Sequence, residues 1–118
     1  MKEQKILIVD DSRTTCVILE DILREEGFTN IIHASNGEDA LTAYAKEEPN
    51  LVLLDIIMPE MNGMDVLKQL DDKARVIIVS AIGQDSVIKQ ARELGALDYL
   101  IKPLDKIEVI KKVLSALK

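Results

Sequence analysis

The sequence has little of what disulfide bonding, export or membrane insertion would require. Its 118 residues include one cysteine, Cys16, which cannot form an internal disulfide and fits a reducing compartment. The longest apolar stretches, such as LVLL at 51–54, are far too short to cross a bilayer. No apolar signal segment follows a charged start. We therefore expect a cytoplasmic protein without membrane insertion.

Basic clusters and nucleotide-binding motifs are also missing. Asp and Glu number 21 against 15 Lys and Arg, which gives a net charge of −6. Without a run of Lys or Arg, direct binding to nucleic acid phosphates is not expected. The sequence contains neither GxGxxG nor the phosphate-binding GxxxxGK pattern, which argues against dinucleotide and ATP binding.

The overall composition is that of an ordinary globular domain. The chain is 47% hydrophobic and 31% charged. Its length suits one hydrophobic core and is too short for two, so we expect a single domain over 1–118. No linker, repeat or low-complexity segment interrupts it.

Short apolar runs alternate with helical patterns from end to end. Strands are predicted at 5–9, 30–34, 51–55, 75–80 and 96–101. The first two helical patterns run from a cap at Ser12 to Gly27 and from a capping box at 35–38 to Pro49. A short helix through Leu67 and Leu70 follows a loop that carries Pro59 and Gly63, and two more are predicted over 84–94 and from a cap at Asp105 to Leu117. Five strands that are each followed by a helix predict an α/β fold: a doubly wound parallel sheet with helices on both faces.

Apolar spacing also predicts which sides of the first and last helices face the core. The inner face of the first helix is predicted to comprise Val17, Leu19, Ile22 and Leu23. That of the last helix is predicted to comprise Ile107, Ile110, Leu114 and Leu117.

Polar residues stand where four of the predicted strands end. The first strand ends in Asp10 and Asp11, the third in Asp55 and the fourth in Ser80, and Lys102 follows the fifth. In a doubly wound sheet these ends share one edge, where ligands bind. Adjacent carboxylates about 4 Å apart repel by roughly 4 kcal/mol at an effective dielectric near 20. Helix capping alone would account for the acid pair but leaves Asp55 and Lys102 unexplained.

Three converging carboxylates favour a hard divalent cation such as Mg²⁺, which would cancel this repulsion and hold an anionic phosphoryl donor. Asp55, which ends the most apolar strand, is the candidate nucleophile that would form an acyl phosphate. Asp10 and Asp11 are then candidate metal ligands. Lys102 and Ser80 are candidates to pair with phosphoryl oxygens.

These residues carry a resemblance to a known family. The Asp10-Asp11 pair, the DIIMPEMNG stretch at 55–63, Ser80-Ala81 and Lys102-Pro103 resemble, in this order, the response-regulator receiver domain of two-component systems, from Lys5 to Leu117. The resemblance implies the flavodoxin-type, CheY-like fold with five parallel strands in the order 2-1-3-4-5. It also implies a cis Lys102–Pro103 bond.

The resemblance further implies a role for each site residue. Asp55 would accept a phosphoryl group from a sensor histidine kinase or a small donor such as acetyl phosphate. Asp11, Asp55 and the backbone carbonyl of Ile57 would bind Mg²⁺, and Asp10 would act largely through water. Ser80 and Lys102 would close on the phosphoryl group. Tyr99 would be the switch aromatic, whose ring turns inward when the hydroxyl residue moves.

The implied output is a switch at a protein surface. Phosphorylation would shift a pre-existing equilibrium and change the surface built from the fourth helix, fifth strand and fifth helix. The SAIGQ stretch at 80–84 and the overall length resemble chemotaxis-type stand-alone regulators, which act on a motor-switch or adaptor protein. We expect a monomer that catalyses its own phosphorylation and dephosphorylation without being a dedicated enzyme.

Several alternatives stay open at this point. A phosphorelay intermediate, or a receiver excised from a longer regulator, would have much the same sequence. A flavodoxin-like mononucleotide binder shares the fold, although Asp10 and Asp11 would repel a flavin phosphate. A haloacid-dehalogenase phosphatase would separate its two acids by one residue.

Ile57 and Ile82 depart from commoner receiver patterns, which place polar groups two residues after the phosphoacceptor and the hydroxyl residue. Both side chains would shield an acyl phosphate from water, so we expect slow autodephosphorylation. No chemical role is assigned to Cys16 or His33. Cys16 is expected to be a small apolar residue of the first helix, and His33 a structural or exposed residue.

Overall fold

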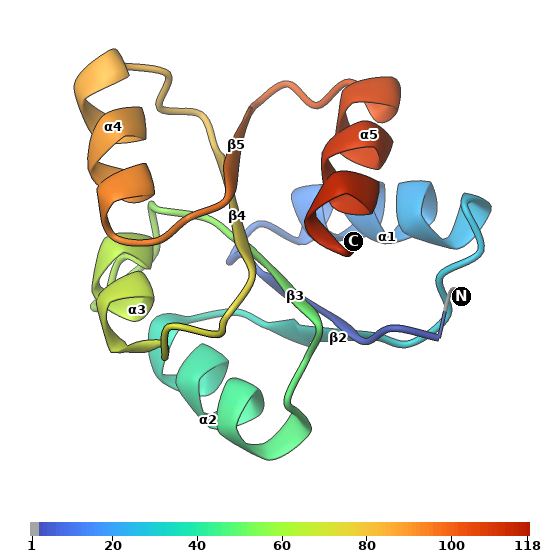
Figure 1. Cartoon of the computed structure of the whole chain (residues 1–118), viewed down its shortest axis with the longest axis horizontal. Helices are drawn as coiled ribbons and strands as arrows, with labels where there is room; N and C mark the ends of the chain where they lie inside the picture. The colour runs from blue at the N-terminus through green and yellow to red at the C-terminus, as the bar shows by residue number, and fades with distance from the viewer. Residues whose placement is uncertain (1–2) are drawn as a thin grey trace.

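A computed structural model describes residues 3–118. Its five strands are β1 (Ile6–Val9), β2 (Ile31–Ala34), β3 (Leu51–Leu54), β4 (Val76–Ser80) and β5 (Asp98–Ile101). Its helices are α1 (Arg13–Glu25), α2 (Gly37–Glu47), α3 (Gly63–Gln69), α4 (Asp85–Glu93) and α5 (Lys106–Ala116). Strands and helices alternate strictly along the chain, as the sequence predicts (Figure 1).

The strands form one parallel sheet in the order β2-β1-β3-β4-β5. This confirms the α/β class and the strand order implied by the family resemblance. All residues of β1 and β3 are buried, because these strands lie inside the sheet and are covered on both faces. Their continuous apolar sequences, ILIV and LVLL, are what such a position requires.

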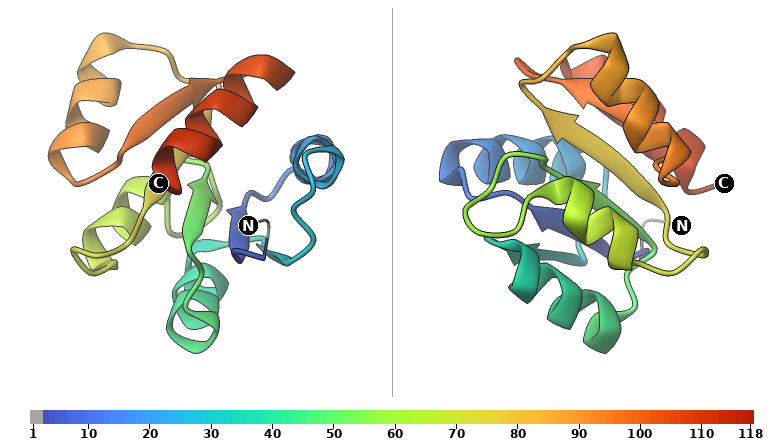
Figure 2. Two further views of the ribbon diagram at one scale, coloured as in Figure 1. Left: turned by 45° about the vertical axis from the view of Figure 1, so that its right-hand side comes forward. Right: turned by 90° about the vertical axis from the view of Figure 1, so that its left-hand side faces the viewer.

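Helices cover both faces of the sheet. α1 and α5 lie together on one face, whereas α2, α3 and α4 lie on the other (Figure 1). The same layers are visible from the two further directions in Figure 2. Each face has its own apolar cluster: Phe28, Leu23 and Val113 belong to the α1–α5 side, and Tyr99, Met64 and Ala91 to the α2–α4 side.

Helix capping confirms two of the predicted N-caps and corrects the third. The side chains of Ser12 and Asp105 accept hydrogen bonds from the amides of Thr15 and Glu108. The capping box predicted at 35–38 is wrong by one residue, because the cap of α2 is Asn36, whose side chain accepts from the Asp39 amide at 2.8 Å. Asn is as good a cap as Ser, so local spacing could not choose between them.

The predicted core-facing sides of α1 and α5 both need correction. In α5 the buried positions are Val109 and Val113, whereas Ile107 is 69% exposed and Leu114 is also exposed. The other two predicted residues, Ile110 and Leu117, are half-buried and pack against the core. Val17 of α1 is likewise exposed, although Leu19, Ile22 and Leu23 face the core as predicted. The apolar residues of α5 extend around more than one side of the helix, so its spacing is compatible with two inner faces and packing selects one.

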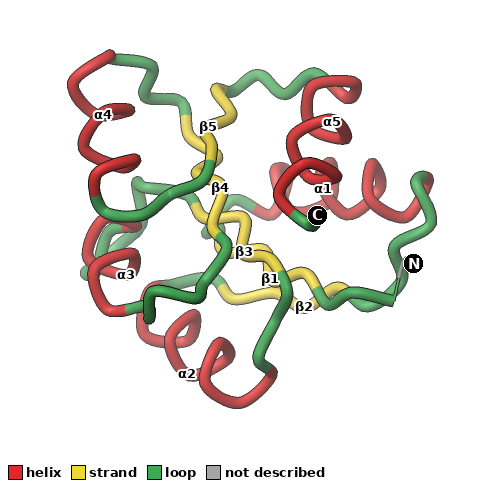
Figure 3. Tube along the Cα trace, in the orientation of Figure 1, coloured by secondary structure: helices red, strands yellow, loops and turns green. Residues whose placement is uncertain are grey.

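Loops at the carboxyl ends of the strands gather at one edge of the sheet (Figure 3). The β1–α1 connection carries Asp10 and Asp11, the β3–α3 connection Asp55 and the β5–α5 connection Lys102, while Ser80 ends β4. The Lys102–Pro103 bond is cis, as the resemblance implies.

Candidate functional site

The three predicted acids converge at this edge. One carboxylate oxygen each from Asp10, Asp11 and Asp55 lies within 4.8 Å of the others. The register of the sheet causes this, because Val9 of β1 pairs with Leu54 of β3 and the next residues, Asp10 and Asp55, therefore lie side by side. Asp10 is 3% and Asp55 5% exposed, whereas Asp11 is open to solvent.

Lys102 reaches the same cluster from the β5–α5 loop. Its ammonium group lies 3.0 Å from Asp10 Oδ2 and 3.5 Å from Asp55 Oδ2. Burial alone would lower the pKa of Lys102, but the hydrogen bond to Asp10 and the charge of Asp55 outweigh it and raise the pKa. The lysine is therefore charged at neutral pH and offsets part of the negative charge of the cluster.

The environment of Asp55 disfavours the ionised form of its carboxyl group. Burial and the charge of Asp10 raise the pKa of the Asp55 carboxyl, and these effects exceed the opposing effects of Lys102 and of the Ile57 and Ile56 amides. The Ile57 amide donates to Asp55 Oδ1 at 3.4 Å. A cation beside Asp55 would favour its ionised, nucleophilic form.

Ser80 ends β4 and is fully buried. Its Oγ accepts a hydrogen bond from the Ile82 amide at 3.2 Å. The hydroxyl of Tyr99 donates to the Ile82 carbonyl at 2.5 Å, and the tyrosine ring is buried. Tyr99 is therefore in the inward position, linked to the same loop as Ser80.

The β3–α3 loop fixes the backbone of Asp55. A Cβ added at Gly63 would lie 2.1 Å from the Asp55 carbonyl oxygen, so this position has room only for glycine. The Gly63 amide also donates to the Ile56 carbonyl at 2.7 Å. Sequence reasoning used Gly63 only as a loop signal and missed this close approach. Glu60 in the same loop has a positive φ of 67°.

The donor set fits Mg²⁺. Asp10, Asp11 and Asp55 are hard oxygen ligands that lie close together, and the ammonium group of Lys102 balances only part of the charge of the two buried acids, Asp10 and Asp55. A divalent cation would cancel the remaining repulsion.

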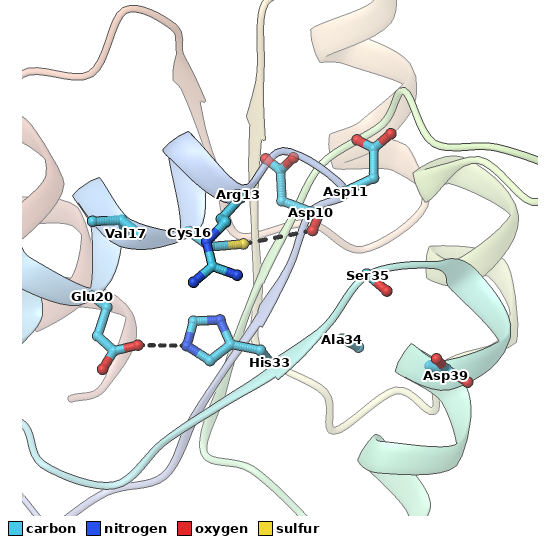
Figure 4. A pocket seen from close by; sticks show the side chains of 10 residues that line it. All are labelled: Asp10, Asp11, Arg13, Cys16, Val17, Glu20, His33, Ala34, Ser35 and Asp39. Carbon is cyan, nitrogen blue, oxygen red and sulfur yellow. Dashed lines mark hydrogen bonds and ion pairs between the residues drawn. The ribbon is translucent and has the colours of Figure 1, made fainter.

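A cavity of about 490 Å³ extends from Asp10 and Asp11 along α1 and β2 (Figure 4). Arg13, Cys16 and His33 line it. His33 pairs with Glu20 at 2.5 Å, and the Cys16 thiol donates to the Asp10 carbonyl at 3.5 Å. Burial, followed by the charge of Asp10, raises the pKa of this thiol. Sequence reasoning did not single out Arg13.

Comparisons with known proteins agree with this geometry. The model of the response regulator receiver domain matches residues 6–114. The chemotaxis protein CheY of Bacillus subtilis is 40% identical over 112 residues, covering 92% of this chain and 93% of its own length. The sporulation initiation phosphotransferase F of the same organism is 41% identical over 120 residues, covering 97% of this chain and 96% of its own.

A solved structure is similar along almost the whole chain. The CheX–CheY–BeF3–Mg²⁺ complex of Borrelia burgdorferi contains a chain with a TM-score of 0.93 and 38% sequence identity, covering 98% of this chain and 90% of that chain. These findings do not favour the flavodoxin-like and dehalogenase alternatives. Because the family model covers all five strands and all but the last residues of α5, the chain belongs to the response-regulator receiver domain family and is CheY-like.

Proposed function

We propose that this receiver is switched by phosphorylation of Asp55 in a chemotaxis pathway. The observation that carries the proposal is the convergence of Asp10, Asp11 and Asp55 with the ammonium of Lys102 at one edge of the sheet. The CheY relatives and the CheY-containing complex support chemotaxis, and the phosphorelay alternative is not favoured.

Asp11 and Asp55 would hold Mg²⁺ through their side chains and Ile57 through its backbone carbonyl, with Asp10 acting largely through water. The ion would supply positive charge for the oxygens of the incoming phosphoryl group. An Asp55 oxygen attacks phosphorus, the bond from phosphorus to the donor breaks, and its electron pair stays on the leaving group. The transfer turns the Asp55 carboxylate into an acyl phosphate.

Lys102 and Ser80 are placed to receive the new phosphoryl group. Lys102 already lies within 3.5 Å of Asp55, so it can pair with a phosphoryl oxygen with little movement. Ser80 would donate its hydroxyl proton after a shift of the β4–α4 loop, and Tyr99 would follow because it bonds to Ile82 of that loop. This movement would alter the α4–β5–α5 surface.

The implied partners are a sensor histidine kinase and a downstream protein such as a motor-switch or adaptor protein. The complex that contains CheX with the related CheY is consistent with a protein target of this kind. We propose that the protein acts in the cytoplasm as a monomer and is a self-catalysing phosphoacceptor rather than a dedicated enzyme. No helix within residues 3–118 is long and apolar enough to cross a membrane.

Beryllofluoride, a phosphoryl mimic without a leaving group, tests the switch. With Mg²⁺ it is expected to shift the amide NMR signals of the Ser80–Gly83 loop and of β5, and Asp55→Asn is expected to abolish these shifts. Shifts that persist in Asp55→Asn, or their absence from the wild type, would contradict the proposal.

A further inference from the structure

We propose that Arg13 determines which small phosphodonors this receiver uses, by contacting the carboxylate leaving group of acyl phosphates. The inference rests on the proposed function of Asp55. It concerns the leaving-group side of the reaction, to which none of the site residues described above is assigned.

The placement of Arg13 is the first argument. It is two residues after Asp11, opens α1 and lines the same cavity as Asp10 and Asp11. Figure 4 shows its guanidinium within this lining, near Cys16 and His33. The side chain is exposed, and within residues 3–118 no hydrogen bond or ion pair occupies it. An exposed arginine changes rotamer in picoseconds to nanoseconds, so it can turn toward the metal-binding end of the cavity.

The second argument is the charge at the start of α1. The positive end of a helix favours acidic residues in its first turn. α2, α3, α4 and α5 each have an acid in the first turn, although α5, like α1, opens with a basic residue, Lys106. α1 begins with Arg13 and has no first-turn acid to balance it. A residue that breaks a local rule without a compensating contact points to a functional constraint.

The chemistry of the donors gives the third argument. When Asp55 attacks acetyl phosphate, the P–O bond breaks and its electron pair leaves on acetate, which becomes an anion. When Asp55 attacks phosphoramidate, the P–N bond of the zwitterion breaks and neutral ammonia leaves. A guanidinium beside the leaving group stabilises the developing acetate charge through charge-assisted hydrogen bonds and offers nothing to ammonia.

The experiment compares rates of Asp55 phosphorylation by acetyl phosphate and by phosphoramidate, followed by intact mass at saturating Mg²⁺. Arg13→Gln is expected to lower the acetyl phosphate rate constant by about five- to tenfold, and to leave the phosphoramidate rate within about twofold. Arg13→Lys should recover part of the loss. The matched control is Arg75→Gln, which removes the same charge just before β4, at the opposite edge of the sheet.

Two further measurements distinguish a direct contact between Arg13 and the leaving group from long-range attraction of the donor and from damage to the phosphoryl site. Long-range attraction of the acetyl phosphate dianion is screened at 0.5 M salt, whereas a direct contact persists. Beryllofluoride has no leaving group, so its affinity for the Mg²⁺-loaded protein should not change in Arg13→Gln.

Equal losses with both donors, a loss that disappears at 0.5 M salt, weakened beryllofluoride binding or an unchanged rate with acetyl phosphate would each overturn the role of Arg13. Failure of the wild type to react with either donor and to bind beryllofluoride would instead refute the proposed function.

Discussion

The ammonium group of Lys102 lies 3.0 Å from the carboxylate of Asp10, although 92 residues separate them in the sequence. This ion pair joins the loop after β1 to the loop after β5 and thereby ties the acid cluster to the start of α5. Asp10 is almost completely buried, so removing its partner leaves a buried carboxylate uncompensated.

Lys102→Met is therefore expected to destabilise the metal-free protein by about 1–3 kcal/mol. Mg²⁺ should reverse part of this loss, because the cation replaces the missing positive charge. Urea denaturation with and without Mg²⁺ measures both effects. Lys106→Met is the control, since its pair with Glu25 is exposed and should contribute less than about 1 kcal/mol. Equal destabilisation by the two substitutions would contradict this account of the cluster.

Asp55→Asn is expected to stabilise the metal-free protein at neutral pH. Burial and Asp10 raise the folded-state pKa of Asp55, so the folded protein binds its proton more tightly than the unfolded chain does. The wild type therefore loses stability as pH rises from the unfolded pKa of about 3.9 through the raised folded pKa, and Asp55→Asn lacks this component.

Urea titrations between pH 4 and pH 8 without divalent metal measure this difference. The stability gained by Asp55→Asn should grow with pH and become constant above the folded-state pKa. With Mg²⁺ the order should reverse, because only the wild type retains the Asp55 carboxylate. A stability difference that does not vary with pH would show that desolvation of Asp55 is not its cause.

Gly63→Ala tests the close approach beneath the phosphoacceptor. Its methyl group would lie 2.1 Å from the Asp55 carbonyl oxygen, so the loop must shift, and we expect a loss of about 2 kcal/mol or more together with impaired phosphorylation. Gly83→Ala is the matched control, because the three heavy atoms nearest its methyl group would all belong to the flexible Ile101 side chain, the closest at 3.3 Å. Similar unfolding midpoints for the two variants would show that the β3–α3 loop is not constrained as described.

Tyr99→Phe removes one hydrogen bond and preserves the ring. Burial raises the pKa of Tyr99, which keeps the hydroxyl a donor to Ile82 at neutral pH. The substitution should cost about 1 kcal/mol and speed hydrogen exchange at the amides of Ile82 and Gly83. Unchanged exchange there would mean that Tyr99 does not hold the β4–α4 loop.

Slow autodephosphorylation remains a prediction of the sequence. Ile57 is 57% exposed and Ile82 is half-buried, and neither side chain offers a hydrogen bond to an attacking water. Replacing them with Asn and Gln should speed loss of the phosphoryl group by roughly tenfold or more, because a polar side chain can orient that water. Decay of the phosphorylated species, followed by intact mass after donor removal, measures this. A wild-type lifetime of only seconds would refute the shielding role.

The elements and the site were predictable because their signals are local and mutually consistent. Asp10, Asp11, Asp55 and Ser80 end predicted strands, and the geometry of a parallel sheet brings those ends to one edge. The inner face of α5 was not predictable in this way, because Ile107 and Val109 both belong to helically spaced apolar sets and only packing against the sheet distinguishes them.

Other features depend on contacts that spacing does not encode. The restriction at Gly63 arises from a neighbouring backbone carbonyl, and the Tyr99–Ile82 bond joins β5 to the loop after β4. Arg13 likewise becomes notable only when the cavity beside Asp11 is known.

Intact-mass analysis after incubation with acetyl phosphate tests the central claim most directly. The account predicts one added phosphoryl group that requires Mg²⁺ and is absent from Asp55→Asn. An adduct that forms equally well in Asp55→Asn, or no adduct on the wild type with Mg²⁺ present, would contradict the assignment of Asp55 as the phosphoacceptor.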